Sequence, residues 1–125
     1  MKQVVTFLLA QDADAALAFY RDTLGLHFVR DDGFALVFEM NGVMLRISKV
    51  PQFTPAQHTV LGWECEDLNA AVDGLAVKGV EFNRYPNMSH DNRGICTFPN
   101  GDRVAWFKDP GGNVLSLSQH APVQD

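Results

Sequence analysis

The sequence is short of positive charge. Ten lysines and arginines stand against fifteen acidic residues, which gives a formal net charge of -5 at pH 7 and a pI of about 5.2. Binding to nucleic acid depends on basic side chains that neutralise phosphates. The composition therefore argues against a nucleic-acid partner.

Long hydrophobic runs are missing as well. The apolar stretch near the N-terminus ends at Ala10, and it is far shorter than the ~20 residues that a membrane-spanning helix needs. No small-residue cleavage site of a secretory signal follows it. We therefore expect a strand at this position, with neither a membrane partner nor a targeting signal.

Residues that commonly bind metals are few and widely spaced. Cys65 and Cys96 lie in unrelated segments without metal-ligand spacing, which favours buried thiols in a reducing, cytoplasmic location. No two histidines stand three to five residues apart, so scattered surface histidines are favoured over a metal site. The four are His27, His58, His90 and His120.

The chain is long enough for one packed core. It has 125 residues, of which 46% are hydrophobic, and it is too short for two ordinary independent domains. We therefore expect a single domain over residues 1–125.

An internal repeat organises this domain. A shift of 55 residues places Asp12 on Asp67 and, after a one-residue gap, Gly25 on Gly79. Both aspartates are placed to cap a helix, and both glycines are placed to end one. Between them, apolar residues recur at helical spacing. Each half therefore contains a predicted helix with one buried stripe.

The end of each half repeats with a larger shift. Residues 43–48 match residues 113–118 at a shift of 70, and the difference comes from an inserted polar stretch over residues 85–101. Each half is predicted to run strand, helix and then three strands. The boundaries are module 1 over residues 1–48, a linker over 49–57, module 2 over 58–120 and a tail over 121–125.

Alternation along the strands separates two sheet faces. Leu45 and Ile47 in one half, and Leu115 and Leu117 in the other, form apolar rows that suit a helix-covered face. We expect the opposite, uncovered faces to form a trough. Four pseudo-equivalent residues should lie around it: Val5, Arg46, Val60 and Ser116.

Two segments carry a family resemblance, DADAALAFYRDTLGLHF over residues 12–28 and VAWFKDPGGNVLSLSQ over residues 104–119, with a weaker one over residues 64–82. They resemble the vicinal oxygen chelate superfamily, which includes glyoxalase I, extradiol dioxygenases, fosfomycin-resistance enzymes and bleomycin-resistance proteins. The resemblance implies an α+β fold in which two tandem βαβββ modules form a curved mixed sheet with a central cleft. It also implies a homodimer.

The resemblance also implies where a metal would bind. In metal-dependent members, a His in the first strand and a Glu in the last strand of each module hold a divalent ion. The corresponding residues here are Val5, Val60, Arg46 and Ser116. Valine has no lone pairs and arginine has no acceptor and a permanent positive charge. We therefore predict no cofactor, and a divalent metal only through non-standard ligands.

The trough supplies the candidate ligand contacts. Arg46 could bind a carboxylate, phosphate or enolate, although an ion pair with Glu64 across the trough, or exposure at its rim, is favoured. Trp106 could stack on a planar ligand, or could be a core or dimer-interface residue. The hydroxyls of Ser116 and Ser118 suit orientation more than catalysis without a base beside them. Further contacts are expected from Phe7, Met44 and Val60.

The inserted stretch contains a second group of candidates. Its SHDNR segment, residues 89–93, could close over the trough, although a merely solvated loop is favoured. The secondary ligand contacts would be Tyr85, Asn87 and Arg93.

The sequence leaves binding and catalysis open. The first hypothesis is a glyoxalase/bleomycin-resistance-like protein that binds a small organic molecule in the cleft without a metal. The alternative is an enzyme of lyase, isomerase or dioxygenase type. It would use Glu64 as a base with Arg46 as an electrophile, or a divalent metal with relocated ligands.

Overall fold

A computed structural model describes residues 1–123 of the chain. These residues form two compact units. Unit 1 consists of Met1–Pro55 and Asp109–Asn113, and unit 2 consists of Ala56–Lys108 and the segment that begins at Val114. The first boundary falls within the predicted linker. The expectation of one domain stays a prediction.

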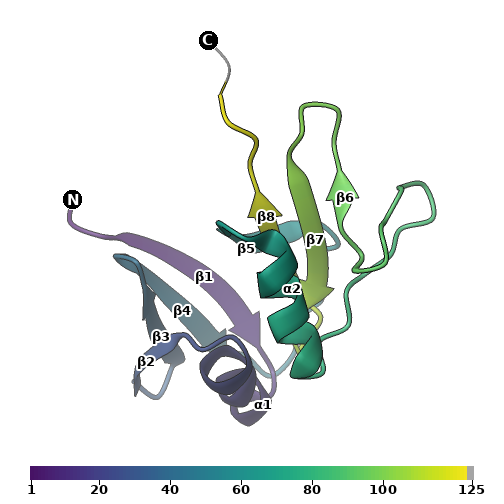
Figure 1. The fold of residues 1–125 in the computed structure, drawn as a ribbon. Coiled ribbons are helices and arrows are strands. Elements are labelled where there is room, and N and C mark those ends of the chain that lie inside the picture. The colour runs from purple at the N-terminus through teal and green to yellow at the C-terminus, as the bar shows by residue number, and fades with distance from the viewer. Residues whose placement is uncertain (124–125) are drawn as a thin grey trace. The chain divides into compact units, whose positions relative to one another are not determined.

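Unit 1 is a four-stranded mixed sheet with a short helical segment (Figure 1). Its strand order is β1-β4-β3-β2, with β1 parallel to β4 and the other neighbours antiparallel. The elements are β1 (Val4–Ala10), α1 (Ala13–Leu17), η1 (Ala18–Thr23), β2 (His27–Asp31), β3 (Ala35–Met40) and β4 (Val43–Lys49).

Unit 2 has the same plan. Its strand order is β5-β8-β7-β6, with β5 parallel to β8 and the other neighbours antiparallel. The elements are β5 (Thr59–Glu64), α2 (Leu68–Val77), β6 (Cys96–Thr97), β7 (Arg103–Lys108) and β8 (Val114–Gln119). The predicted α+β class and tandem βαβββ modules are therefore confirmed. No helix in residues 1–123 has the length and apolar character needed to cross a membrane.

The repeat extends to individual cross-strand pairs. In unit 1, Phe7 pairs with Arg46. Adding 55 to the first number and 70 to the second gives Gly62 and Ser116, which pair in unit 2. The shifts found in the sequence thus correspond to one sheet register used twice.

The helix ends follow the prediction from the two aspartates and glycines. The Asp12 carboxylate accepts from the Ala15 amide at 3.0 Å, and Asp67 accepts in the same way from Ala70 at 3.1 Å. Beyond Leu17, the first helix changes to the wider π-helix η1, which the apolar spacing did not predict.

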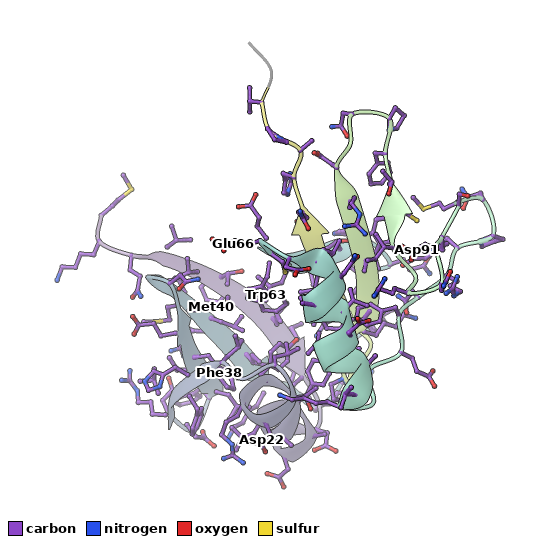
Figure 2. All side chains as sticks on the ribbon, in the orientation of Figure 1. Asp22, Phe38, Met40, Trp63, Glu66 and Asp91 are labelled. Atoms are coloured by element: carbon purple, nitrogen blue, oxygen red, sulfur yellow. The ribbon has the colours of Figure 1, made fainter. Side chains whose placement is uncertain are left out.

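The core of each unit lies between its helix and one sheet face. In unit 1, the fully buried Tyr20 of η1 packs on Phe38 of β3, with ring centroids 5.9 Å apart; Phe38 is labelled in Figure 2. In unit 2, the fully buried Phe107 contacts Phe82, with centroids 5.6 Å apart. Helix α2 contributes the buried side chains of its apolar stripe, Leu68 and Val72.

The inserted stretch divides the edge strand of unit 2. Phe28 pairs with Phe38 in unit 1, and the equivalent Phe82 makes an isolated bridge to Phe107. The chain then leaves the sheet after Asn83 and returns as the two-residue strand β6. The insertion therefore forms a loop within what is a continuous strand in unit 1.

The turn between β7 and β8 is built around a buried carboxylate and belongs to unit 1. Asp109 is 7% exposed. It accepts from the Tyr20 hydroxyl at 2.6 Å and from the side-chain amide of Asn113 at 2.8 Å. Burial, followed by the nearby Asp109 charge, raises the pKa of Tyr20.

Candidate functional site

Both units have an open sheet face opposite the core. Leu45 and Leu115 are fully buried, as the predicted helix-facing rows require. The neighbouring Arg46 and Ser116 point to the other side and are partly buried. The predicted separation of two faces is therefore present in each unit. That the two open faces line one trough stays a prediction.

The open face of unit 1 is apolar around one arginine. Phe7 is 64% exposed beside Arg46, and Met44 pairs with Val5 one step along the sheet. Arg46 Nη2 lies 2.8 Å from Asp32 Oδ2, in the turn between β2 and β3. The guanidinium thus has an acceptor within unit 1. The expectation of a pair with Glu64, or of exposure at the rim, stays a prediction.

Asp32 is held by more than this ion pair. One carboxylate oxygen accepts from the backbone amides of Phe34 and Ala35, at 3.0 and 2.8 Å. These backbone bonds, with the Arg46 bond next, lower the pKa of Asp32 to about 2. The carboxylate thus stays charged and occupies part of the Arg46 fork.

The open face of unit 2 is aromatic. Trp106 pairs with Ser116 across the strands, and two rings stand nearly perpendicular to its indole. Tyr85 is at a centroid distance of 5.6 Å and Phe98 is at 6.4 Å. The Ser116 hydroxyl lies directly over Gly62, where an added Cβ would overlap it. Glycine at this position therefore leaves room for the hydroxyl beside the indole.

Strand β5 is irregular at Val60, the residue expected to be equivalent to Val5. Thr59 pairs with Val114, and the next pair is Leu61 with Leu115, so the ladder steps over Val60. Val60 lies in a β-bulge, which redirects a side chain from simple alternation. Its equivalence to Val5 does not hold at the level of strand register.

The inserted loop is organised by a histidine. His90 Nε2 accepts a hydrogen bond from the backbone amide of Tyr85 at 2.9 Å, and His90 Nδ1 lies 2.8 Å from the Gly94 carbonyl oxygen. Since a carbonyl accepts hydrogen bonds, Nδ1 carries the proton. His90 is thus not a scattered surface histidine, because its ring fixes the backbone that presents Tyr85 to Trp106.

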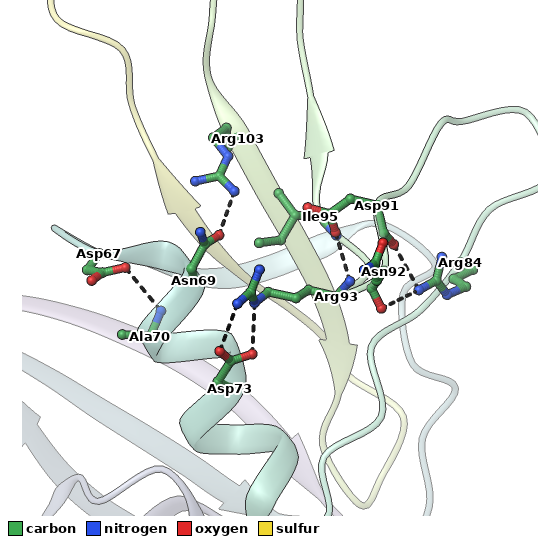
Figure 3. Close-up of polar contacts among 10 residues, drawn as sticks. All are labelled: Asp67, Asn69, Ala70, Asp73, Arg84, Asp91, Asn92, Arg93, Ile95 and Arg103. Atoms are coloured by element: carbon green, nitrogen blue, oxygen red, sulfur yellow. Dashed lines mark hydrogen bonds and ion pairs between the residues drawn. The ribbon is translucent and has the colours of Figure 1, made fainter.

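Two arginines also hold this loop, as Figure 3 shows. Arg93 makes a two-point ion pair with Asp73 of α2, at 2.9 and 3.1 Å. Arg84 Nη2 donates to the carbonyls of Asp91 and Asn92. Residues 89–93 are largely exposed, with only His90 partly buried, and Arg93 ties this solvated loop to α2. Asn87 is exposed.

Ser118 and Glu64 stand at the end of the unit 2 face. They pair in register, and Glu64 is exposed. Ser118 Oγ lies 3.0 Å from Nε2 of His120, whose Nδ1 lies 3.5 Å from Asp102. The structure therefore places a base beside Ser118.

Neither cysteine has the features of an activated thiol. Burial raises the pKa of the Cys96 thiol, and burial likewise raises the pKa of Cys65. Cys96 Sγ lies 3.3 Å from His90 Nδ1. Because Nδ1 already carries a proton, His90 is not oriented to act as a base towards this thiol.

The side chains at the family's usual metal positions do not fit a divalent ion. Two are valines, one is an arginine held by a carboxylate, and Ser116 offers a weak neutral donor. Within residues 1–123, no three His, Cys, Asp or Glu side chains come together as a candidate metal cluster. Chemistry routed through a metal at the usual positions has no support from these donors.

Two sheets of the same order, each with its helix following the first strand, define a tandem βαβββ protein. The family model described as Glyoxalase/Bleomycin resistance protein/Dioxygenase superfamily matches residues 2–117. The chain belongs to this superfamily, so the resemblance noted in the sequence is confirmed. No curated protein gives a significant match.

Solved structures agree with this assignment. A putative glyoxalase family protein from Bacillus anthracis is 16% identical with a TM-score of 0.75, over 97% of this chain and 96% of that one. A superfamily member from Sphaerobacter thermophilus is 22% identical with a TM-score of 0.75, over 96% and 98%. A lactoylglutathione lyase from Agrobacterium tumefaciens is 25% identical with a TM-score of 0.67, over 93% and 91%.

Proposed function

We propose that the protein binds a small, partly apolar organic molecule on the open face of unit 2, centred on Trp106. One observation carries the proposal. The partly buried indole stands between two perpendicular aromatic rings and beside the Ser116 hydroxyl. An apolar surface with a few placed polar groups is the usual character of a small-molecule site. The ligand would contact the indole and hydrogen-bond to the serine.

The loop arrangement supports this proposal. Tyr85 contacts the indole from a backbone that His90 fixes through two hydrogen bonds. The bidentate Arg93–Asp73 pair ties the same loop to α2. Binding costs less when side chains are already ordered in their bound positions. Because Tyr85 and Trp106 are already ordered, this face favours binding of a ligand with a flat apolar part.

We further propose that binding needs no metal at the family's usual positions, because their side chains are poor donors. On the open face of unit 1, Arg46 would bind an anionic or polar group through the part of its fork that Asp32 does not occupy, with apolar contacts from Phe7 and Met44. On the face of unit 2, Val60 and Ser118 are the remaining proposed contacts. A homodimer in the cytoplasm stays part of the proposal.

The binding hypothesis is preferred to acid–base catalysis by Glu64 and Arg46. Arg46 already pairs with Asp32, and Glu64 is exposed on the other unit. A lyase reaction with a relocated metal is the competing proposal, prompted by the 25% identical lactoylglutathione lyase. Elemental analysis of protein purified without added metal separates the two, because the lyase proposal requires a stoichiometric divalent ion.

The test uses the two tryptophans as separate reporters. Trp63 pairs with Leu117 on the helix-covered side of the sheet (Figure 2), whereas Trp106 pairs with Ser116 on the open side. Metal-free Trp63→Phe protein therefore reports on Trp106 alone, and Trp106→Phe reports on Trp63 alone. A panel of planar aromatic acids, keto acids, bleomycin and S-lactoylglutathione is titrated against both variants. Thermal unfolding is measured in parallel.

The expected result is a saturable fluorescence change in Trp63→Phe protein with the same compound that raises the unfolding temperature. A ligand that binds only the folded state must stabilise it. Trp106→Ala should weaken binding of that compound by about tenfold, the upper range for one aromatic contact. Equal responses from both tryptophan variants, or no response across the panel, would contradict the proposed site.

A further inference from the structure

Three side chains at the end of unit 2 lie in series outside the Trp106 cluster. Ser118 Oγ lies 3.0 Å from His120 Nε2, and His120 Nδ1 lies 3.5 Å from Asp102 Oδ2. A hydroxyl, an imidazole and a carboxylate in this order are the groups by which a serine becomes a nucleophile. The sequence pattern did not reveal the series, because Asp102 is distant from Ser118 along the chain.

The carboxylate selects the imidazole tautomer that this chemistry requires. Asp102 accepts hydrogen bonds, so the imidazole proton belongs on the facing Nδ1. Nε2 is then an unprotonated acceptor that faces the Ser118 hydroxyl. The hydroxyl proton can therefore pass to Nε2 when the oxygen attacks.

Backbone contacts hold Asp102 and the histidine in place. Asp102 Oδ1 accepts from the Ala121 amide at 2.8 Å, directly after His120, and Oδ2 accepts from the Asn100 side chain at 3.1 Å. The Asp102 amide also donates to Asn100 Oδ1 at 3.0 Å. These contacts, led by the Ala121 amide, lower the pKa of Asp102, so the group is a carboxylate at neutral pH. Strand β8 fixes the other side of the histidine, because it ends at Gln119.

We propose that Ser118 is the nucleophile of an acyl-transfer site, with His120 as its general base and Asp102 as the positioning residue. Ser118 Oγ attacks the carbonyl carbon of an ester, and His120 takes the hydroxyl proton. The bond from carbon to the alkoxy oxygen breaks, and His120 returns the proton to the departing alcohol. Water then attacks the acyl-serine by the same route, releasing the carboxylic acid and restoring the serine.

The surroundings indicate the class of ester. An open depression of about 460 Å³ adjoins the histidine, and it is lined by Glu64, Cys65, Glu66, Gln119 and His120. Two carboxylates on the rim attract positive charge. The fitting substrate is a small ester that carries a cationic group. The proposed acyl transfer does not require the Trp106 indole, and it gives Ser118 a role beyond its proposed ligand contact.

The test is covalent labelling with a fluorophosphonate. Attack on this probe forms a serine oxygen–phosphorus bond and releases fluoride with the serine proton. Intact-mass and peptide mass spectrometry should find one adduct on Ser118 in folded protein, and none after unfolding in urea. Ser118→Ala should abolish labelling.

The repeat supplies a matched control. Ser48 of β4 is the 70-residue equivalent of Ser118, but Val50 stands where the second half has His120. Ser48→Ala should leave the labelling rate unchanged. A probe that reacts with Ser48, or that labels Ser118→Ala protein at the same rate, would overturn the proposal.

The histidine and the carboxylate are tested without removing the serine. His120→Gln should lower the labelling rate by about 10²-fold, the smaller of the usual effects of a general base. Asp102→Asn should lower the rate, because asparagine no longer offers a carboxylate to the facing Nδ1. Asp102→Glu keeps a carboxylate and should restore part of the rate. Unfolding curves verify that all three variants fold.

The outcomes distinguish the two proposed sites. Trp106→Ala should weaken binding of the ligand found by fluorescence by about tenfold and keep the labelling rate of Ser118. His120→Gln should keep the ligand affinity and slow the labelling by about 10²-fold. Cationic and neutral acetate esters of equal size are then compared, with faster hydrolysis expected for the cationic ester. An unlabelled wild-type protein at millimolar probe, or full labelling of His120→Gln protein, would rule out the nucleophile.

Discussion

The two units share a strand plan and differ on their open faces. Phe7 and Arg46 form a cross-strand pair in unit 1, and the equivalent pair in unit 2 is Gly62 and Ser116. A bulky apolar group and a charge are thus replaced by a small residue and a hydroxyl beside Trp106. The shared positions determine the fold, and the positions that differ determine what each face can bind.

The edge strands of the two units also share a position in the sheet and differ in their side chains and loops. In unit 1, β2 runs from His27 to Asp31 with one shift of register between Phe28 and Arg30, whereas in unit 2 the edge is split by the loop that follows Phe82. Loops accept insertions more readily than the strands they connect. The insertion brought Tyr85 and His90 to the face of one unit alone. Each of the following predictions tests how far the two halves remain equivalent.

The largest expected loss of stability comes from truncating two core phenylalanines that occupy equivalent positions in the two units. Phe38 and Phe107 are both 0% exposed and occupy equivalent positions. Truncating either to alanine leaves a cavity in a packed core, which should lower the free energy of unfolding by about 3–5 kcal/mol. Urea unfolding measures the change. Phe34→Ala is the control, since Phe34 is 80% exposed and should change stability by less than about 0.5 kcal/mol. A large difference between Phe38→Ala and Phe107→Ala would break the equivalence.

The two hairpin turns should respond differently. The β7–β8 turn buries Asp109 with four hydrogen bonds to its carboxylate, whereas the β3–β4 turn is exposed at Asn41 and Gly42. Asp109→Ala leaves the Tyr20 hydroxyl without this acceptor and should cost about 2–3 kcal/mol. Asn41→Gly should cost less than about 0.5 kcal/mol, because Asn41 has a φ of 49° that glycine adopts freely. Thermal unfolding of both variants checks the contrast, and equal losses would refute it.

Much of the fold could be predicted because it depends on local patterns. The caps at Asp12 and Asp67 act over three residues, and the buried leucines of β4 and β8 follow strict alternation. The two sequence shifts also relate the Phe7–Arg46 pair to the Gly62–Ser116 pair, and they fail where β5 is bulged at Val60. Local and periodic signals of this kind do not depend on the three-dimensional arrangement of distant segments.

The candidate sites depended on contacts that have no local signal. Asp32 reaches Arg46 from 14 residues away, and Asp102 meets His120 only after the chain has turned through β7 and β8. The bulge at Val60 exists only in relation to β8, so no pattern within β5 could show it. The sequence therefore identified the open faces and several of their side chains, but it did not identify the partners of those side chains.

A smaller effect is expected at the two helix caps. Asp12→Ala and Asp67→Ala each remove one hydrogen bond to a free amide in the first turn. Each should cost about 1 kcal/mol, measured by urea unfolding. Asp12→Asn and Asp67→Asn are the matched controls, because asparagine keeps an accepting oxygen. A cost at one cap alone would show that the π-helix behind Asp12 has changed the role of its cap.

The smallest effect concerns the arginine that distinguishes the two faces. Arg46→Ser places the residue type of Ser116 at the equivalent position in unit 1. The pKa of Asp32 is about 2, and the amides of Phe34 and Ala35 are larger causes than Arg46. The pKa should therefore rise only part of the way towards the value of about 3.9 found in unfolded chains. In wild-type protein, a lowered folded-state pKa means that Asp32 contributes stability above pH ~3.9, and that this contribution is lost as the pH falls towards 2.

The neighbouring ion pair between Lys49 and Asp31 gives the matched control. The hydrogen bond from Lys49 is the largest cause that lowers the pKa of Asp31. Lys49→Met should thus return the pKa of Asp31 further towards its ordinary value than Arg46→Ser returns that of Asp32. Carboxyl NMR titrations of the wild type and both variants measure the two shifts. If Arg46→Ser restored the Asp32 pKa fully, the ion pair and not the turn would be the main cause that lowers it.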